Sequence, residues 1–250
     1  MKTIKEIVAN KAELIALKKA EIKTVKGGLS TVRDCDVLKS FGVNKDSDNE
    51  LERTIIGNTY LWMDSHDDVH AKGCFAKTIK ERSKSVFHLH DHEFKITSKV
   101  GEPIKIYENA IKWQDLGVNK EGITDALFMD TKIIKDYNNQ IFNEYKSGRI
   151  NQHSVGMQYV KIDLAVNDEE FEEEYKAWQD NIDNIGNKDH AEAKGYFWLV
   201  REAKLIEISA VLLGSNELTP TINEPLKSTQ KKEAEKSLQK ANELLTKLKF

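Results

Sequence analysis

Apolar and polar residues alternate along several stretches of the chain in the manner of half-buried strands. β-Branched and aromatic residues are concentrated at 54–63, and at 152–164 the apolar residues Val155, Met157 and Tyr159 fall on one side. Further strands are expected at 104–116, at 122–129, around the histidine-rich residues 87–93 and within 195–213. The centre of the chain is therefore predicted to form a sheet.

Other regions carry apolar residues at helical spacing. Residues 2–26 place Ile4, Ile7, Val8 and Ile15 on one face and Lys and Glu on the other, and two glycines follow. Shorter helices are expected at 73–83, 131–147 and 168–182, a loop at 184–193, and a charged helix at 228–249 with coiled-coil spacing of its apolar residues.

Strands and helices do not alternate regularly along the chain. This order favours an α+β fold, with an antiparallel sheet or barrel surrounded by helices, over a doubly wound parallel sheet. We divide the chain into an N-terminal helical extension and linker (1–50), a body (51–225) and a C-terminal helical tail (226–250). The tail is too short to be stable as an isolated helix, so we expect it to dock on a partner or on a second copy.

Charge is distributed unevenly over the 250 residues. The net charge is -3, but residues 1–27 and residues 226–250 each contain seven Lys and three Glu, so each end carries +4 and the middle carries -11. An acidic body disfavours a nucleic-acid-binding core, and the basic ends are either solvated helices or contacts for an acidic partner. Two cysteines make no disulfide framework, which favours a reducing compartment. No apolar run reaches membrane-spanning length, and the Lys- and Glu-bearing N-terminus is not typical of a signal peptide.

Three of the seven histidines, His88, His90 and His92, lie at alternate positions of residues 87–93 (FHLHDHE). On a strand they would share one face, as a metal site, a proton-transfer site or a polar edge. The spacing is one residue short of the H-x-H-x-D-H motif of metallo-β-lactamase-type hydrolases, and a zinc site needs further ligands. Distant candidates for such ligands are His153 and His190, with His66 and His70 closer in sequence.

A nucleophile and an orienting carboxylate are also present among the predicted strands. Ser154 follows His153 at the start of a strand, and Gly156 nearby would let a substrate backbone approach. Adjacent strand residues point to opposite faces, so the base for Ser154 must come from a distant histidine. Glu207 interrupts an apolar strand, where it either orients an imidazole or points to solvent. Taken alone, Ser154 is more typical of an ordinary strand serine than of a nucleophile, and Cys35 and Cys74 lie in unremarkable contexts.

Four segments in this order resemble the tailed-phage prohead proteases, serine peptidases that mature capsids and are distant relatives of the herpesvirus assemblins. Residues 63–75 (MDSHDDVHAKGCF) are similar to the family's D-x-x-x-D-x-V-x-x-G-A-F, with Cys74 in the alanine position. Residues 89–93 (LHDHE) with Val100 and Gly101 are similar to L-x-x-H-D … I-G, with Glu93 replacing Asp. Residues 152–157 (QHSVGM) and 205–211 (LIEISAV) are similar to x-x-S-I/V-G-F and L-x-E-V-S-x-V, and Ser215 and Asn216 stand where the family has P-A-N-P.

The resemblance implies a serine endopeptidase with a β-barrel core. It assigns Ser154 as nucleophile, His92 as base and Glu207 as the residue that orients the imidazole, and it implies no metal or other cofactor. It also implies scaffold and major capsid protein precursors as substrates, self-cleavage, and a location inside the procapsid in the host cytoplasm. The oxyanion donors are not identified by any motif; Arg149 and backbone amides after Ser154 are candidates.

Two other functions stay open on the sequence. One is a metal-dependent hydrolase that uses His88, His90 and His92. The other is a non-catalytic scaffold or capsid-assembly protein that acts through its terminal helices. No nucleic-acid or membrane partner is expected.

Overall fold

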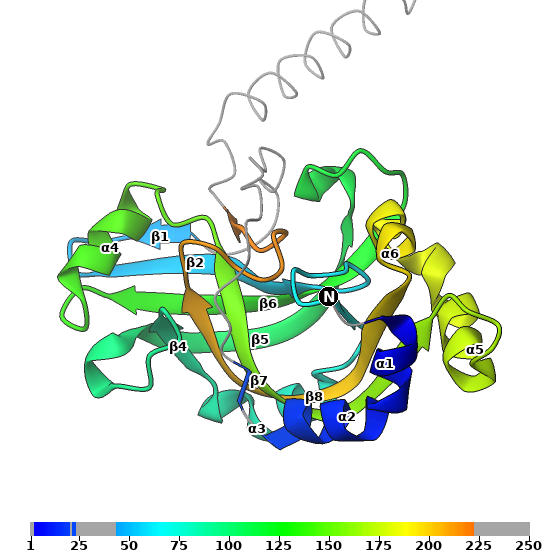
Figure 1. Cartoon of the computed structure of the whole chain (residues 1–250). Helices are drawn as coiled ribbons and strands as arrows, with labels where there is room; N and C mark the ends of the chain where they lie inside the picture. The colour runs from blue at the N-terminus through cyan, green and yellow to red at the C-terminus, as the bar shows by residue number, and fades with distance from the viewer. Residues whose placement is uncertain (1–2, 21, 24–43, 223–250) are drawn as a thin grey trace, which may run out of the picture.

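The computed structural model describes residues 3–20, 22–23 and 44–222. The predicted C-terminal helix at 228–249 and most of the predicted linker lie outside these residues, as does Cys35. The described part is an α+β fold in which helices surround one large sheet (Figure 1). The expectation of an α+β class is therefore confirmed.

The sheet of the described residues contains nine strands. Their bounds are β1 (Asn44–Asp46), β2 (Glu50–Thr59), β3 (Asp68–His70), β4 (Phe87–His90), β5 (Lys99–Lys112), β6 (Ile123–Ile134), β7 (His153–Val166), β8 (Tyr196–Ala210) and β9 (Thr221–Ile222). Hydrogen bonds join them in the order β1-β2-β6-β5-β4-β8-β3, with β7 on β8 and β9 on β2. Most pairs are antiparallel, but β3 and β4 run parallel to β8. Among the described residues, no hydrogen bonds join the two ends of this strand order, so the sheet is not closed and the predicted barrel is not confirmed.

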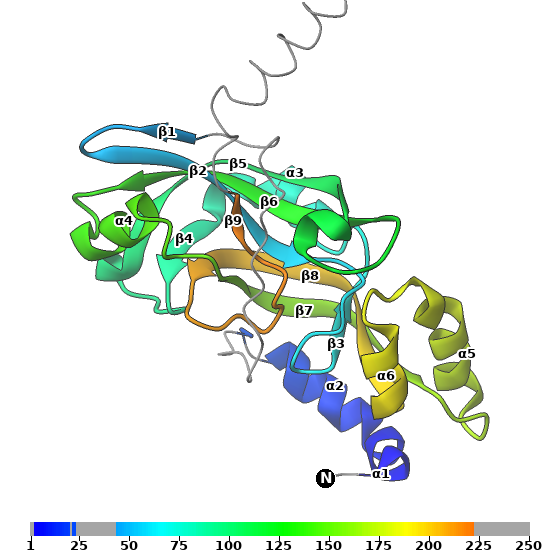
Figure 2. The same ribbon diagram turned by 90° about the horizontal axis from the view of Figure 1, so that it is seen from above.

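Six α-helices of the described residues flank this sheet (Figures 1 and 2). They are α1 (Ile4–Ala9), α2 (Lys11–Ala20), α3 (Ala76–Arg82), α4 (Asn139–Lys146), α5 (Glu172–Asn181) and α6 (Lys188–Lys194). Seen from above, β7 and β8 lie side by side, with α2 and α6 beyond one end and α4 beyond the other. No described helix is long and apolar enough to cross a membrane.

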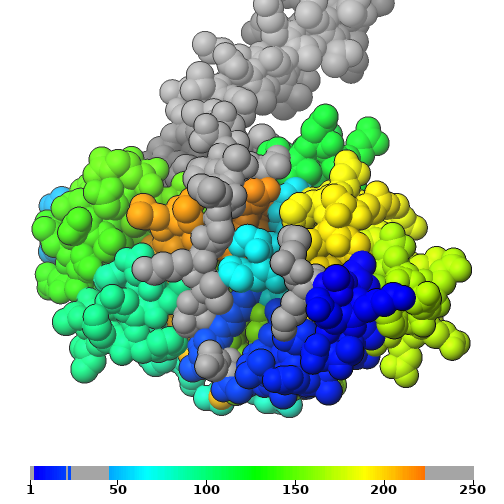
Figure 3. Space-filling view, viewed as in Figure 1, coloured from blue at the N-terminus to red at the C-terminus, as the bar shows by residue number. Residues whose placement is uncertain are grey.

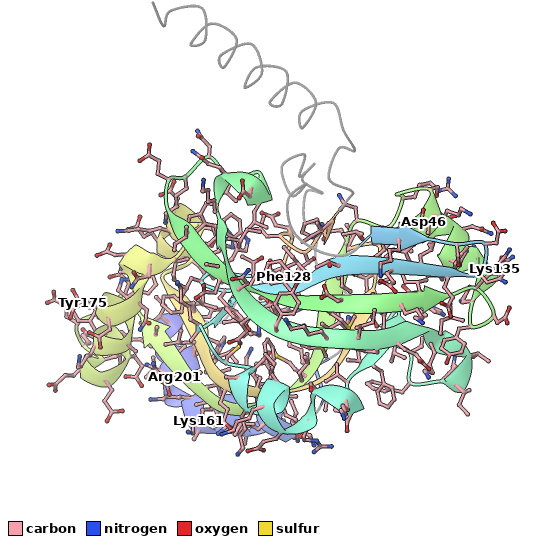
Figure 4. The ribbon with its side chains drawn as sticks, turned by 180° about the vertical axis from the view of Figure 1, so that it is seen from behind. Asp46, Phe128, Lys135, Lys161, Tyr175 and Arg201 are labelled. Carbon is pink, nitrogen blue, oxygen red and sulfur yellow. The ribbon has the colours of Figure 1, made fainter. Side chains whose placement is uncertain are left out.

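The long strand β8 is the centre of the fold because it is bonded to β3, β4 and β7. Its residues alternate between two apolar clusters, with Trp198 and Val200 in the larger one and Phe197 and Leu199 in another. Leu199 is fully buried, and burial of such a side chain contributes about 2 kcal/mol to stability. Figure 4 shows the opposite side of the molecule, where Phe128 of β6 lies in mid-view and Lys161 and Arg201 lie at the periphery.

Three local predictions were wrong. The predicted helix 131–147 begins as the end of β6, since Thr131 and Ile133 pair with both β2 and β5, and α4 starts only after Asn138 caps it through Ile141 N–H at 3.1 Å. The predicted loop 184–193 contains α6, which ends at the left-handed Gly195 (φ 77°). The predicted helix 2–26 is two helices that end at Ala20. In each case tertiary pairing or capping overrides the local pattern.

The two N-terminal helices pack against the body. Ile7 of α1 is buried in the main core cluster, and Lys11 of α2 forms an ion pair of 2.7 Å with Glu174 of α5. Lys5 and Glu170 make a second pair of 2.8 Å. Figure 3 shows these helices, in dark blue, lying against the yellow-green region of α5 and α6.

Candidate active site

Strand β8 presents two polar residues, Glu207 and Ser209, on one face. Both side chains are fully buried, so the interpretation that Glu207 points to solvent is wrong. A carboxylate at this depth needs hydrogen-bond donors. Ser209 Oγ donates to Oε2 of Glu207 at 2.6 Å, and Nδ1 of His92 lies 2.6 Å from Oε1.

His92 reaches Glu207 because the chain turns sharply after β4. The strand ends at His90, and Asp91 (φ 52°) and His92 (φ 57°) are both left-handed. Such a conformation is uncommon for residues other than glycine and occurs at functional sites. Main-chain bonds hold the turn on β8: the N–H of Asp91 donates to Ala210 O (2.9 Å) and the N–H of His92 to Ser209 Oγ (3.1 Å). The expectation that His88, His90 and His92 share one face of a strand is therefore wrong.

The hydrogen bonds fix the proton on the ring of His92. Both oxygens of an ionised Glu207 accept, so Nδ1 of His92 carries the proton and donates. In the neutral tautomer with this proton, Nε2 is a lone-pair acceptor, and it is buried without a partner among the described residues. A buried polar atom without a partner is costly and calls for an explanation. A neutral imidazole held by a carboxylate, with a free Nε2, is the arrangement of a general base in a Ser-His-acid triad.

The register of β7 on β8 places Ser154 at this site. Ser154 is directly opposite Ser209, and Gly156 is opposite Glu207, so all four share one face. Residues directly opposite have Cβ atoms about 5 Å apart. Gly156 makes room for the carboxylate, because a Cβ there would lie 1.9 Å from Oε1 of Glu207. Glu207 therefore contacts His92 directly, and the register places Ser154 on the same face of the neighbouring strand. No hydrogen bond joins Ser154 to His92 among the described residues, and the triad stays a prediction.

The other two histidines of residues 87–93 have partners of their own. His88 Nδ1 lies 2.9 Å from Thr131 Oγ1, and its Nε2 lies 3.1 Å from Tyr145 OH. His90 Nδ1 lies 3.1 Å from Asp91. Because these rings do not converge with His92, the arrangement gives no support to the predicted alternative of a three-histidine metal site. No group of three His, Cys, Asp or Glu side chains in the described part is arranged to bind a metal ion.

The other candidate residues from the sequence form no hydrogen bond or ion pair with His92 or Glu207 in the described part of the chain. Cys74 is buried, and burial raises the pKa of its thiol well above the usual range, so it is not an activated nucleophile. Arg149 is bound by Glu144 at 2.6 and 2.9 Å on the exposed end of α4. His66 is half-buried in the turn before β3, and His190 lies on α6.

A small polar hollow adjoins Ser154. Its volume is about 10 Å³, roughly the room of one water molecule. His70 lines it and has no hydrogen-bond partner for either ring nitrogen in the described chain, and burial lowers its pKa to about 4. Lys23 and Met157 also line this hollow.

Two contributors were missed in the sequence. Ser209, which bridges Glu207 and the main chain of His92, was given no role, although a position two residues after Glu207 places it on the same strand face. Lys23 carries no local signal, because its position depends on a contact with β7.

Comparisons of the chain with protein-family models, with curated proteins and with solved structures found no match.

Proposed function

We propose that the protein is a serine endopeptidase in which Ser154 attacks a peptide carbonyl. His92 takes the hydroxyl proton at Nε2 and later donates it to the leaving amine, and Glu207 holds the ring by accepting from Nδ1–H. The observation that carries the proposal is the buried, unpartnered Nε2 of a histidine whose Nδ1 is bound to a buried glutamate at 2.6 Å. Ser154 on the same face supplies the nucleophile.

Labelling with a fluorophosphonate probe tests the chemistry. The full-length protein should be labelled once, at Ser154, and Ser154→Ala should not be labelled. Ser147→Ala is the matched control, because Ser147 is an exposed serine at the end of α4 whose hydroxyl binds main-chain oxygens. Absence of labelling in the native protein, or labelling that persists in Ser154→Ala, contradicts the proposal. The first of these outcomes would favour a non-catalytic scaffold or assembly protein.

The resemblance to prohead proteases supports a more specific role. We propose that the substrates are scaffold and capsid protein precursors inside a phage procapsid, and that the sheet curls as the barrel of that family does. The contact of β7 with β2 across the molecule supports the curled shape. Mass spectrometry of the protein co-expressed with a scaffold or capsid precursor should detect cleavage by the native chain and none by Ser154→Ala. Precursor that stays intact with a protein that labels at Ser154 would contradict this role and leave the serine chemistry in place.

A further inference from the structure

The outer edge of β7 next to Ser154 is occupied by a short extended segment of the same chain. The N–H of Lys23 donates to Met157 O at 2.7 Å, and the N–H of Met157 donates to Lys23 O at 3.1 Å, in an antiparallel bridge. Met157 lies three residues after Ser154 on the same strand. The main chain of Lys23 thus pairs with this edge at one residue, in the way that an added strand would begin.

The same edge carries main-chain groups at more than one residue of β7. At its other end Thr219 Oγ1 donates to His153 O at 2.7 Å and accepts from His153 N–H at 3.2 Å. Main-chain groups that face one edge of a strand recur at every second residue, so the N–H and C=O of Val155 face the same edge between these two positions. A peptide bound antiparallel through Met157 and Val155 would pass directly over Ser154.

The side chain of Lys23 enters a buried acidic pair. Its Nζ lies 3.2 Å from Oδ2 of Asp64 and also binds Asp68, and the Lys23 side chain is only 9% exposed. Asp68 is fully buried and accepts from Tyr159 OH. Burial alone would lower the pKa of Lys23, but the attraction of Asp64 and Asp68 outweighs it and raises that pKa well above its usual range. The pair therefore holds an ammonium group in its charged form.

Other donors remain at the two carboxylates when Lys23 is removed, although one of the two negative charges then has no cation beside it. Lys18 of α2 lies 2.7 Å from the other oxygen of Asp68, and the main-chain N–H groups of His66 and Asp68 donate to Asp64 Oδ1 at 2.8 and 3.1 Å. A buried carboxylate that keeps these donors survives the loss of one partner better than an isolated charge does. Lys23 is thus a removable occupant of a site built by other residues.

We infer that Asp64, Asp68 and the β7 edge form a binding subsite for an extended, lysine-bearing peptide, and that Lys23 fills this subsite in the uncleaved chain. The description of that peptide as substrate rests on the proposed function. The hollow that remains beside Ser154, at about 10 Å³, has no room for a second peptide while Lys23 is in place. Lysine-bearing partners must displace this segment, so it lowers the apparent affinity for them.

Binding is tested without catalysis in full-length protein that carries Ser154→Ala. The probe is a fluorescein-labelled peptide with the sequence of residues 19–27, compared with the same peptide carrying norleucine in the place of Lys23. Fluorescence anisotropy should show at least about tenfold tighter binding when Lys23→Met is added to the Ser154→Ala protein. The norleucine peptide should bind at least about tenfold more weakly, and the lysine peptide should raise the Tm of the Lys23→Met protein.

Lys5→Met is the matched control, because Lys5 lies on α1 of the same N-terminal region and, among the described residues, forms its ion pair with exposed Glu170. It should leave peptide binding as weak as in Ser154→Ala alone. If Lys23→Met does not fold, Lys23→Gln keeps an N–H donor for the acidic pair and replaces it. Equal binding with and without the Lys23 substitution, or equal binding of the two peptides, overturns the inference. Neither result bears on labelling of Ser154, so failure of the subsite and failure of the proposed function are distinguishable.

Discussion

Two hydrogen-bond networks, one around His153 and one around His92, lie on opposite faces of β7 and β8. They differ in whether Nε2 of the histidine has a hydrogen-bond partner. On one face His153 Nδ1 lies 2.8 Å from Thr219 O, which only accepts, so His153 Nε2 accepts from Tyr145 OH at 2.8 Å. Tyr145 then accepts from His88 Nε2–H, and His88 Nδ1 accepts from Thr131. Every ring nitrogen in this network has a partner.

On the other face the ring of His92 is satisfied only at Nδ1. The partner is Glu207, and Nε2 has none among the described residues. We call the fully paired network of His153 the closed network and that of His92 the open network. His153 and Ser154 are neighbours in sequence, yet His153 belongs to the closed network and Ser154 faces the side of Glu207, because successive strand residues point to opposite faces. The comparison shows that a buried histidine is a candidate base when its environment leaves one lone pair available, and a structural residue when it does not.

The largest effect is expected when the open network loses its nucleophile. Ser154→Ala should lower peptide-bond turnover by about a millionfold, since triad members act as a unit. Its unfolding free energy should change by less than about 1 kcal/mol, because the substitution removes one hydroxyl from a strand. Urea unfolding and cleavage of a precursor protein measure the two quantities. Substantial cleavage by this variant in a clean background would contradict the assignment.

A comparable loss is expected when the base is removed. His92→Ala should match Ser154→Ala in turnover, because no other imidazole is bound to Glu207 in the described chain. His90→Ala is the matched control: His90 precedes the left-handed turn and contacts Asp91, so turnover should fall by much less. If His90→Ala alone is inactive, the assignment of the base is wrong by two residues.

A smaller loss is expected when the carboxylate is displaced. Gly156→Ala would place a Cβ 1.9 Å from Oε1 of Glu207, so Glu207 must leave His92. Loss of the orienting carboxylate in a triad costs about 10⁴ in turnover. Gly148→Ala, at a turn with open space around it, controls for the general effect of replacing glycine with alanine near this strand, although its φ of 72° makes it strained as well. Turnover of Gly156→Ala near that of the native protein would show that Glu207 does not orient His92.

Substitutions in the closed network should lower the stability of the protein and leave its catalytic activity unchanged. Tyr145→Phe removes the hydroxyl that joins His88 to His153 and leaves two buried nitrogens without a partner. We expect a loss of about 2 kcal/mol in the free energy of unfolding, measured by urea titration, with fluorophosphonate labelling at Ser154 unchanged. A variant that keeps its stability but loses labelling would reverse the roles of the two networks.

The closed network also predicts a dependence of stability on pH. Burial lowers the pKa of His88 to about 3 and that of His153 to about 4, while the unfolded chain titrates near 6.5. The unfolded state therefore binds more protons, and each histidine lowers stability by about 1.4 kcal/mol per pH unit as the pH falls from 6.5 toward 4. His153→Gln should reduce this slope by that amount in urea titrations between pH 7 and pH 5. An unchanged slope would show that His153 is not held neutral in the native state.

Much of the architecture was predictable from local pattern alone. Alternating residues at 54–63, 104–116, 122–129 and 152–164 all fall within or overlap strands, and the α+β class followed from their order along the chain. The prediction of a helix at 131–147 was wrong at its start because Thr131 and Ile133 pair with residues of β2 and β5. These partner residues are far from 131–147 in the sequence. Periodicity indicates which face of a helix or strand is apolar. It does not indicate which other strands or helices pack against that element.

The sequence by itself indicated which side chains could carry chemistry, but it placed His92 wrongly on a strand face with His88 and His90. Ser154, His92 and Glu207 were proposed as a triad because four short segments resemble one family. Only the tertiary structure decided that Glu207 is buried, that His92 leaves the strand through a left-handed turn, and that Ser209 and Gly156 shape the site. The reason is that burial and hydrogen-bond partners depend on the register between strands, and register is set by the packing of the whole sheet. Lys23 is the clearest case, since its partners Asp64, Asp68 and Met157 lie more than forty residues away along the chain.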